Sequence, residues 1–137
     1  MAKTNVRSFA GQKKVLAMDD DEAIRKLLSW GLPRLGYEVV TAEDGEEAIT
    51  LFRQAKEAGQ PFAAVIIDLT VKGPLSGREV MSRLREIDSG VLSVVSSGHA
   101  GAPAMRSHVD HDFDEALPKP YTLADLGRVL GKLLRER

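Results

Sequence analysis

Apolar and polar residues alternate along the chain with two different periods. Short, almost continuous apolar runs are typical of strands buried on both faces, and longer segments with apolar residues three or four positions apart are typical of helices that bury one face. The short runs predict five strands, at residues 14–18, 38–41, 63–67, 91–95 and 115–117. Because helical segments separate these strands, we expect an α/β fold with an open, doubly wound, five-stranded parallel sheet. The expected strand order is 2-1-3-4-5, with five helices.

The helical segments differ in how clearly the sequence marks them. The first two span about 22–35 and 45–58, and the segment 102–113 is predicted as a weak fourth helix. The third helix has its apolar residues at Val80, Met81, Leu84 and Ile87. Thr122 and Asp125 form the pattern of a capping box, which predicts the start of the last helix. Its apolar stripe follows at Leu126, Val129, Leu130, Leu133 and Leu134.

The first helix contains a conflict between pattern and residue type. Gly31 and Pro33 lie inside its apolar periodicity, although an interior proline costs about 3 kcal/mol and ends or kinks a helix. We therefore expect this helix either to end near Trp30 or to bend there. Trp30 lies off the apolar face, so it either packs against the last helix or is exposed as a contact for a partner.

Composition and charge exclude several classes of protein. The 137 residues are enough for one domain, expected over 14–137 after a tail or linker at 1–13. The net charge of −1 gives no general attraction to nucleic acid or to a membrane surface. No cysteine is present, so disulfides and thiol catalysis are excluded. No apolar segment is long enough for a signal peptide or a membrane span, so we expect a soluble cytoplasmic domain.

Polar residues with distinct chemistry follow four of the five predicted strands. Asp19 and Asp20 follow the first strand, Asp68 the third, Ser96 the fourth and Lys119 the fifth. The carboxyl ends of parallel strands lie at one edge of the sheet, so we expect these side chains to converge there. Carboxylates bind Mg²⁺, and a carboxylate can also accept a phosphoryl group. The hydroxyl and the ammonium group are suited to bind phosphoryl oxygens.

The same residues carry a resemblance to a known family. Segments 15–20, 66–68, 95–98 and 119–121 resemble the receiver domain of bacterial two-component response regulators, in the family's order and over roughly 14–134. That family has a flavodoxin-like fold. The loop over 68–77 looks like the longer loop of receivers in hybrid histidine kinases.

The resemblance implies a metal site and a phosphorylation site. Asp68 is expected to be phosphorylated, with Mg²⁺ bound by Asp20, Asp68 and the backbone carbonyl of Thr70, and by Asp19 mostly through a water molecule. Ser96 stands at the family's switch position. Lys119 stands at the position of its lysine, and the peptide bond after Lys119 is expected to be cis.

The resemblance also implies the partners. The phosphoryl donor is expected to be a phosphohistidine on a sensor histidine kinase or a histidine phosphotransfer domain, docked over the first helix and the loop after the last strand. Such a domain promotes its own phosphorylation and dephosphorylation but turns over no free metabolite, so it is not classed as an enzyme. We expect a monomer, with dimerisation on phosphorylation left open, and no binding of nucleic acid or membrane by this chain.

Two positions depart from the family pattern. Ala116 stands where the family commonly has an aromatic switch residue, so a moving aromatic ring cannot report phosphorylation here. Lys72 stands where the loop after the phosphoacceptor usually has a proline, which affects the rigidity of that loop. Neither change removes a chemical group from the predicted site.

Three other functions remain to be weighed. An unphosphorylated docking module is one, and Ala116 gives it some support. A phosphatase of the haloacid dehalogenase type also uses an aspartate at a strand end, but it commonly has a second aspartate where Thr70 stands. A flavodoxin-like nucleotide binder needs a phosphate loop after the first strand, where residues 19–21 would repel phosphate. A stand-alone regulator and a receiver cut from a hybrid kinase both fit the sequence, and the loop and tail favour the second.

Overall fold

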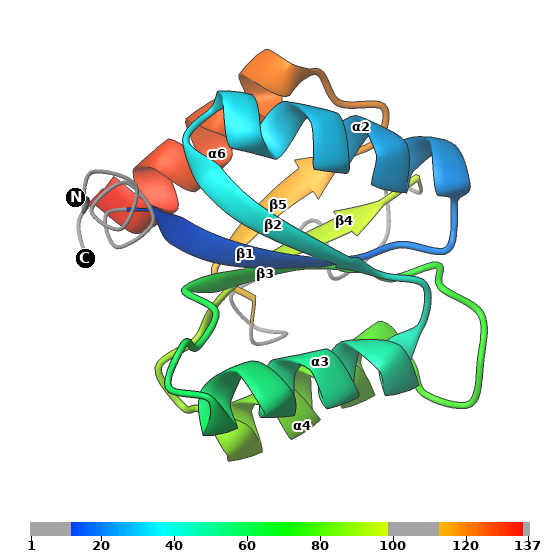
Figure 1. The fold of residues 1–137 in the computed structure, drawn as a ribbon. Coiled ribbons are helices and arrows are strands. Elements are labelled where there is room, and N and C mark those ends of the chain that lie inside the picture. Colours follow the sequence, from blue (N-terminus) through cyan, green and yellow to red (C-terminus); the bar gives the residue numbers. More distant parts are fainter. Residues whose placement is uncertain (1–11, 99–112, 136–137) are drawn as a thin grey trace, which may run out of the picture.

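The computed structural model describes residues 12–98 and 113–135, which form a single sheet with helices on both faces (Figure 1). The strands are β1 (Lys13–Met18), β2 (Tyr37–Ala42), β3 (Ala64–Asp68), β4 (Leu92–Ser97) and β5 (Glu115–Pro118). All neighbouring strands pair in parallel, in the order β2-β1-β3-β4-β5. The predicted strands and their order are therefore confirmed, with bounds that differ from expectation by no more than two residues.

Four helices lie within the described residues. They are α2 (Glu22–Arg34), α3 (Gly45–Glu57), α4 (Gly77–Ile87) and α6 (Leu123–Arg135). Helices α2 and α6 cover one face of the sheet, and α3 and α4 cover the other (Figure 1). The predicted weak helix at 102–113 lies outside the described residues, except for Phe113. Most of the predicted tail also lies outside them, and Lys13 already belongs to β1.

The central strands are buried on both faces, as their apolar sequences predict. In β1, Leu16 and Met18 pack in the core cluster beneath α3 and α4, while Val15 and Ala17 pack in the cluster beneath α2 and α6. Strand β3 divides its side chains between the same two clusters. Because side chains alternate across a strand, each central strand contributes to two cores and fixes its own register. That register determines which residues are placed at the end of each strand.

Of the two alternatives for the first helix, an end near Trp30 is wrong, because α2 continues to Arg34. Gly31 and Leu32 are buried against α6, and a Cβ at Gly31 would lie only 2.5 Å from Leu123 Cδ1. This close packing holds the helix past the glycine. Pro33 lies in the last turn, where its carbonyl accepts a hydrogen bond from the Gly36 N–H and closes the helix.

Trp30 is an exposed side chain, with 53% of its surface accessible. The Arg34 guanidinium lies 4.0 Å from the centre of its ring. Packing against the last helix, one of the two alternatives for Trp30, is therefore not observed. No helix within 12–98 or 113–135 combines the length and apolar character that crossing a membrane requires.

Side-chain caps fix the starts of the helices that follow the strand ends. The Asp21 carboxylate caps α2 by accepting from the Ala23 N–H at 2.8 Å. Ser76 and Glu79 form a complete capping box at α4. The predicted capping box of Thr122 and Asp125 is confirmed at α6, with reciprocal hydrogen bonds of 3.0 and 2.9 Å. These caps hold the loops between strand end and helix in defined conformations.

Candidate functional site

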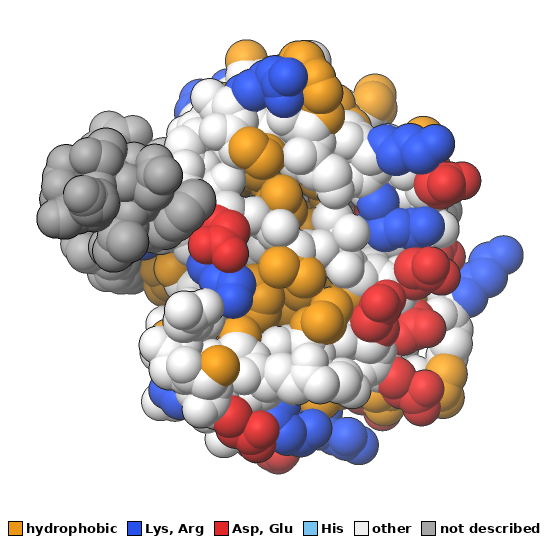
Figure 2. Space-filling view, viewed as in Figure 1, with side chains coloured by type: hydrophobic (Ala, Val, Ile, Leu, Met, Phe, Trp, Pro, Cys, Tyr) orange, Lys and Arg blue, Asp and Glu red, His pale blue; other side chains and the backbone are white. Residues whose placement is uncertain are grey.

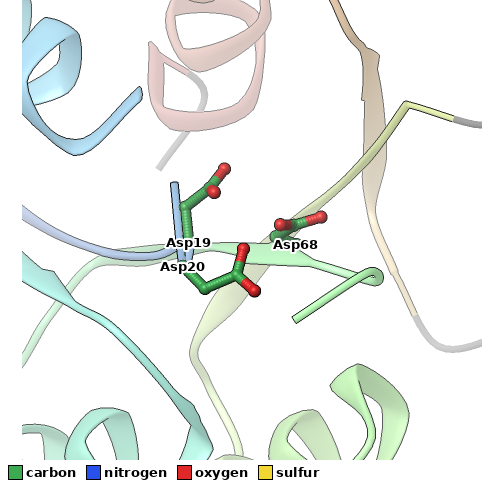
Figure 3. A group of neighbouring side chains, drawn as sticks. All are labelled: Asp19, Asp20 and Asp68. Carbon is green, nitrogen blue, oxygen red and sulfur yellow. The ribbon is translucent and has the colours of Figure 1, made fainter. Parts of the chain in front are cut away.

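Three carboxylates converge where β1 and β3 end. Asp19 and Asp20 follow the last residue of β1, and Asp68 is the last residue of β3. Each offers one oxygen, and the three oxygens lie within 4.8 Å of one another (Figure 3). Asp19 and Asp68 are buried, whereas Asp20 is exposed. The predicted convergence of these three residues at one edge of the sheet is thus present in the structure.

The Lys119 ammonium group bridges the two buried carboxylates. Its Nζ lies 2.8 Å from Asp19 Oδ2 and 3.3 Å from Asp68 Oδ2. The backbone N–H of Lys119 donates to the Ser97 carbonyl at 3.0 Å, which ties the end of β5 to β4. The Lys119–Pro120 peptide bond is cis, as the resemblance implies. Lys119 therefore reaches from β5 to the acids that follow β1 and β3.

Ser96 lies directly beside Asp68. In the parallel register Asp68 is paired with Ser96 on β4. The Ser96 hydroxyl is buried and has no hydrogen-bond partner within the described residues. A buried hydroxyl without a partner is unfavourable, so its position beside Asp68 calls for an explanation. A group bound to Asp68 would supply an acceptor for this hydroxyl.

Thr70 holds the other oxygen of Asp68, which the sequence analysis did not anticipate. Both the backbone N–H and the hydroxyl of Thr70 donate to Asp68 Oδ1, at 3.0 and 2.8 Å. The signal was an aspartate with a threonine two residues later, because an Asp side chain often bonds the backbone N–H two residues on. The expected role of the Thr70 backbone carbonyl as a metal ligand stays a prediction.

The electrostatics of the site reflect buried negative charge. Burial raises the pKa of Asp19 above its ordinary value, and the charge of Asp68 adds to this effect against the hydrogen bonds from Lys119 and the Asp21 N–H. Burial alone would lower the pKa of Lys119, but its hydrogen bonds to the two carboxylates and their charges together raise it. Lys119 is thus firmly protonated, while one ammonium group only partly compensates the acids around it.

Tyr121 is a second neighbour that the sequence analysis did not assign to the site. It is buried in the core beneath α2 and α6, two residues after Lys119. Burial, followed by the negative charges of Asp19 and Asp68, raises the pKa of its phenol. Tyr121 therefore stays neutral close to Asp19 and Asp68. Acidic side chains also gather on the outer surface, on the right-hand side of Figure 2, where the strands end.

The donor set fits a divalent cation with hard, oxygen-preferring chemistry. Mg²⁺ is bound in proteins through one or two carboxylates together with water and phosphate oxygens. Three carboxylate oxygens within 4.8 Å match this preference, and their mutual repulsion would be reduced by a cation. A strand-end carboxylate with a bridging lysine and a free buried hydroxyl can also accept and hold a phosphoryl group.

Comparison with known proteins agrees with this arrangement. Residues 15–130 match the family model of the response regulator receiver domain. The chain belongs to this family. The receiver fold and the membership of two-component response regulators, both expected from the sequence, are confirmed.

Individual relatives show the same likeness. The chain is 35% identical over 124 residues to the transcriptional regulatory protein PrrA of Mycobacterium tuberculosis, covering 90% of this chain and 51% of PrrA. The response regulator TrrA of Thermotoga maritima, solved in complex with Mg²⁺–BeF, is 30% identical with a TM-score of 0.72, covering 90% of this chain and all of that one.

A response regulator of Burkholderia pseudomallei, solved with a phosphorylated aspartic acid, a calcium ion and citrate, is 27% identical with a TM-score of 0.72. The match covers 89% of this receiver and 66% of that chain. The receiver spans about half the length of the curated relatives that it matches.

Replacing Lys119 tests how strongly the acid cluster depends on its ammonium group. In Lys119→Met, two buried carboxylates lose their shared cation, so the free energy of unfolding at pH 7 should fall by about 3 kcal/mol. The measurement is urea unfolding without divalent cations. The matched control is Lys132→Met, which removes an ion pair between an exposed lysine and the partly buried Glu115 and should cost no more than about 1 kcal/mol. Equal losses in the two variants would contradict the account.

Ser96 and Ser93 provide a matched pair of buried serines on β4. Ser96→Ala should leave the free energy of unfolding unchanged or raise it by up to about 1 kcal/mol, because the lost hydroxyl has no partner among the described residues. Ser93→Ala should lower it by about 2 kcal/mol, because the Ser93 hydroxyl is hydrogen-bonded to both the carboxylate and the N–H of Asp114. Thermal or urea unfolding measures both. A large loss in Ser96→Ala would show that its hydroxyl is already bound.

Proposed function

We propose that this receiver accepts a phosphoryl group on Asp68 from a phosphohistidine of a sensor histidine kinase or a histidine phosphotransfer domain, in a Mg²⁺-dependent reaction. The observation that carries the proposal is the Lys119 ammonium group, 2.8 Å from Asp19 and 3.3 Å from Asp68, beside the unpartnered Ser96 hydroxyl. A carboxylate, a fixed cation and a free donor are the groups that accepting and holding a phosphoryl group requires.

The transfer is a single displacement at phosphorus. Asp68 Oδ1 accepts two hydrogen bonds from Thr70, whereas Oδ2 has, among the described residues, only the longer 3.3 Å contact with Lys119, so we assign Oδ2 as the attacking oxygen. The new Oδ2–P bond forms as the P–N bond to the donor imidazole breaks. The bonding electron pair returns to the imidazole nitrogen, and the product is an acyl phosphate on Asp68. Later attack by water on phosphorus releases phosphate and restores the carboxylate.

Two side chains of the receiver act on the phosphoryl oxygens. Lys119 Nζ lies against Asp68 Oδ2, so it is positioned to pair with an oxygen of the incoming group as negative charge spreads over it. Ser96 faces Asp68 across the β3–β4 register and donates its hydroxyl to another oxygen. The Ser96 hydroxyl thereby gains a partner only in the phosphorylated state. That difference between the two states biases the end of β4.

Asp19, Asp20 and Asp68 would hold Mg²⁺ together with the backbone carbonyl of Thr70, Asp19 mostly through water. When bound, the ion supplies positive charge that offsets the carboxylates and the phosphoryl oxygens. The relatives solved with Mg²⁺–BeF and with a phosphorylated aspartic acid and calcium support this assignment. The balance of charge supports it as well, because a single ammonium group lies beside three carboxylates.

The rival functions fit the site less well. A haloacid-dehalogenase-type phosphatase needs an acid two residues after its nucleophile, whereas the Thr70 hydroxyl is a neutral donor already bonded to Asp68. A docking module that is never phosphorylated would have no use for an unpartnered buried hydroxyl beside a bridged carboxylate. We therefore favour a phosphoacceptor that promotes its own phosphorylation and dephosphorylation, turns over no free metabolite and functions in the cytoplasm as a monomer before phosphorylation.

The donor domain is proposed to dock beside α2. An open groove there is lined by Glu22, Arg25, Lys26, Ser29, Trp30 and Thr41. Several of its residues belong to the first turns of the helix that follows Asp19 and Asp20. The exposed ring of Trp30 offers an aromatic contact of the kind that often dominates the energy of an interface. Origin from a hybrid kinase stays a prediction, because the relatives reported above are response regulators.

Phosphorylation of Asp68 is tested with a small acyl-phosphate donor and Mg²⁺, followed by intact-mass measurement. We expect the parent protein to gain one phosphoryl group, and we expect a chelator to abolish the gain. Asp68→Asn should gain none, because it lacks the acceptor carboxylate. The matched control is Asp88→Asn, an aspartate paired with Lys56 away from the site, which should be phosphorylated like the parent. A folded parent protein that gains no phosphoryl group from either this donor or a phosphorylated phosphotransfer domain would contradict the proposal.

A further inference from the structure

Arg25 on α2 bonds the backbone of the acid pair rather than its carboxylates. Its Nη1 donates to the Asp19 carbonyl at 2.9 Å, and its side chain is only 18% exposed. Its Nη2 lies 3.9 Å from Glu43 Oε2, but the Glu43 side chain is 70% exposed. An exposed ion pair at that distance contributes little. The hydrogen bond to Asp19 is therefore the contact of Arg25 that has structural consequence.

The hydrogen bond from Arg25 holds the one polar group of Asp19 that no other described residue engages. The Asp19 N–H donates to the Ala42 carbonyl at 3.0 Å, Oδ1 accepts from the Asp21 N–H at 2.9 Å, and Oδ2 is held by Lys119. The Asp19 carbonyl is the remaining polar group of this residue, and Arg25 holds it. Every hydrogen-bonding group of Asp19 is thus engaged.

The orientation of the Asp20 side chain depends on the same hydrogen bond between Arg25 and the Asp19 carbonyl. The Asp19 carbonyl and the Asp20 N–H belong to one planar peptide group, so holding the carbonyl restricts the backbone dihedrals on both sides of it. The Asp20 side chain is exposed, and no hydrogen bond to its carboxylate is found in the described part of the chain. Its approach to Asp19 and Asp68 is therefore set by the backbone.

We propose that Arg25 is a positioning residue for the divalent-cation site, which holds the Asp19–Asp20 peptide so that the Asp20 carboxylate faces Asp68. This inference rests on the proposed function, since it assumes that the three acids bind Mg²⁺. Groups that orient metal ligands without touching the metal commonly change metal affinity by about 10- to 100-fold when they are removed.

A purely electrostatic role for Arg25 predicts the opposite sign. A guanidinium close to a cation site repels the cation, so removing it would tighten Mg²⁺ binding if charge were its only contribution. Removing a positioning group weakens binding instead. A residue that only supports the fold would lower stability and leave the affinity of the folded protein unchanged. The direction of the change in Mg²⁺ affinity therefore separates the three roles.

The experiment is calorimetric titration of the full chain with Mg²⁺ alone, without phosphoryl donor, with folding of each variant checked by circular dichroism. Arg25→Met should weaken Mg²⁺ binding by about tenfold. Arg25→Lys keeps the charge and one poorer hydrogen bond, so roughly threefold weakening is expected. The matched control is Arg34→Met on the same helix, whose guanidinium bonds the Trp30 carbonyl and lies over the Trp30 ring, and which should leave the affinity unchanged.

Unchanged or tighter Mg²⁺ binding by folded Arg25→Met would overturn the inference. If that variant does not fold, Arg25→Lys decides, and an affinity equal to that of the parent would overturn it. Failure of the proposed function gives a different result. In that case the parent protein itself binds no Mg²⁺ and matches Asp20→Asn, and the role of Arg25 fails together with the metal site.

Discussion

The bridge from the Lys119 ammonium group to two buried carboxylates is the interaction on which this structure depends. Asp19 and Asp68 lie at the ends of neighbouring strands, and like charges in a buried position oppose folding unless a cation compensates them. Lys119 comes from the far edge of the sheet, so its two ion pairs link the ends of β1, β3 and β5. One ammonium group lies beside three carboxylates, so this compensation is incomplete. A divalent cation bound to these carboxylates would complete the compensation, and Lys119 could then pair with an incoming anionic group.

The sheet converts sequence order into the geometry of this cluster. Because the strands are parallel and β1 and β3 are neighbours, Asp19 and Asp68, 49 positions apart in the chain, are brought together at one edge. Burial on both faces fixes the register of the central strands, so the position of Asp68 opposite Ser96 follows from core packing. The helix caps then limit the freedom of the loops that carry Asp19, Asp20 and Thr70. The positions of the site residues therefore follow from the packing of core residues that take no part in the chemistry.

The sequence predicted those parts of the site that depend on strand ends. Asp19, Asp20, Asp68, Ser96 and Lys119 each follow an apolar run, and a parallel sheet leaves little choice about where such residues meet. It did not predict contacts that depend on local conformation or on a neighbouring helix, such as the Thr70 hydroxyl on Asp68 or the Arg25 guanidinium on the Asp19 carbonyl. The sequence left open whether the first helix ends or bends near Trp30, and tertiary packing against Leu123 accounts for its continuation through Gly31 and Pro33.

The central claim is that Asp68, and no other acid, receives the phosphoryl group. The most direct measurement is borohydride reduction of the protein after reaction with a phosphorylated donor, followed by peptide mapping. Reduction converts an aspartyl phosphate to homoserine and so marks the residue covalently. The account predicts homoserine at position 68 only, and only when Mg²⁺ was present during phosphorylation. Homoserine at position 19 or 20, or none at all in a protein that the donor has demonstrably encountered, would contradict it.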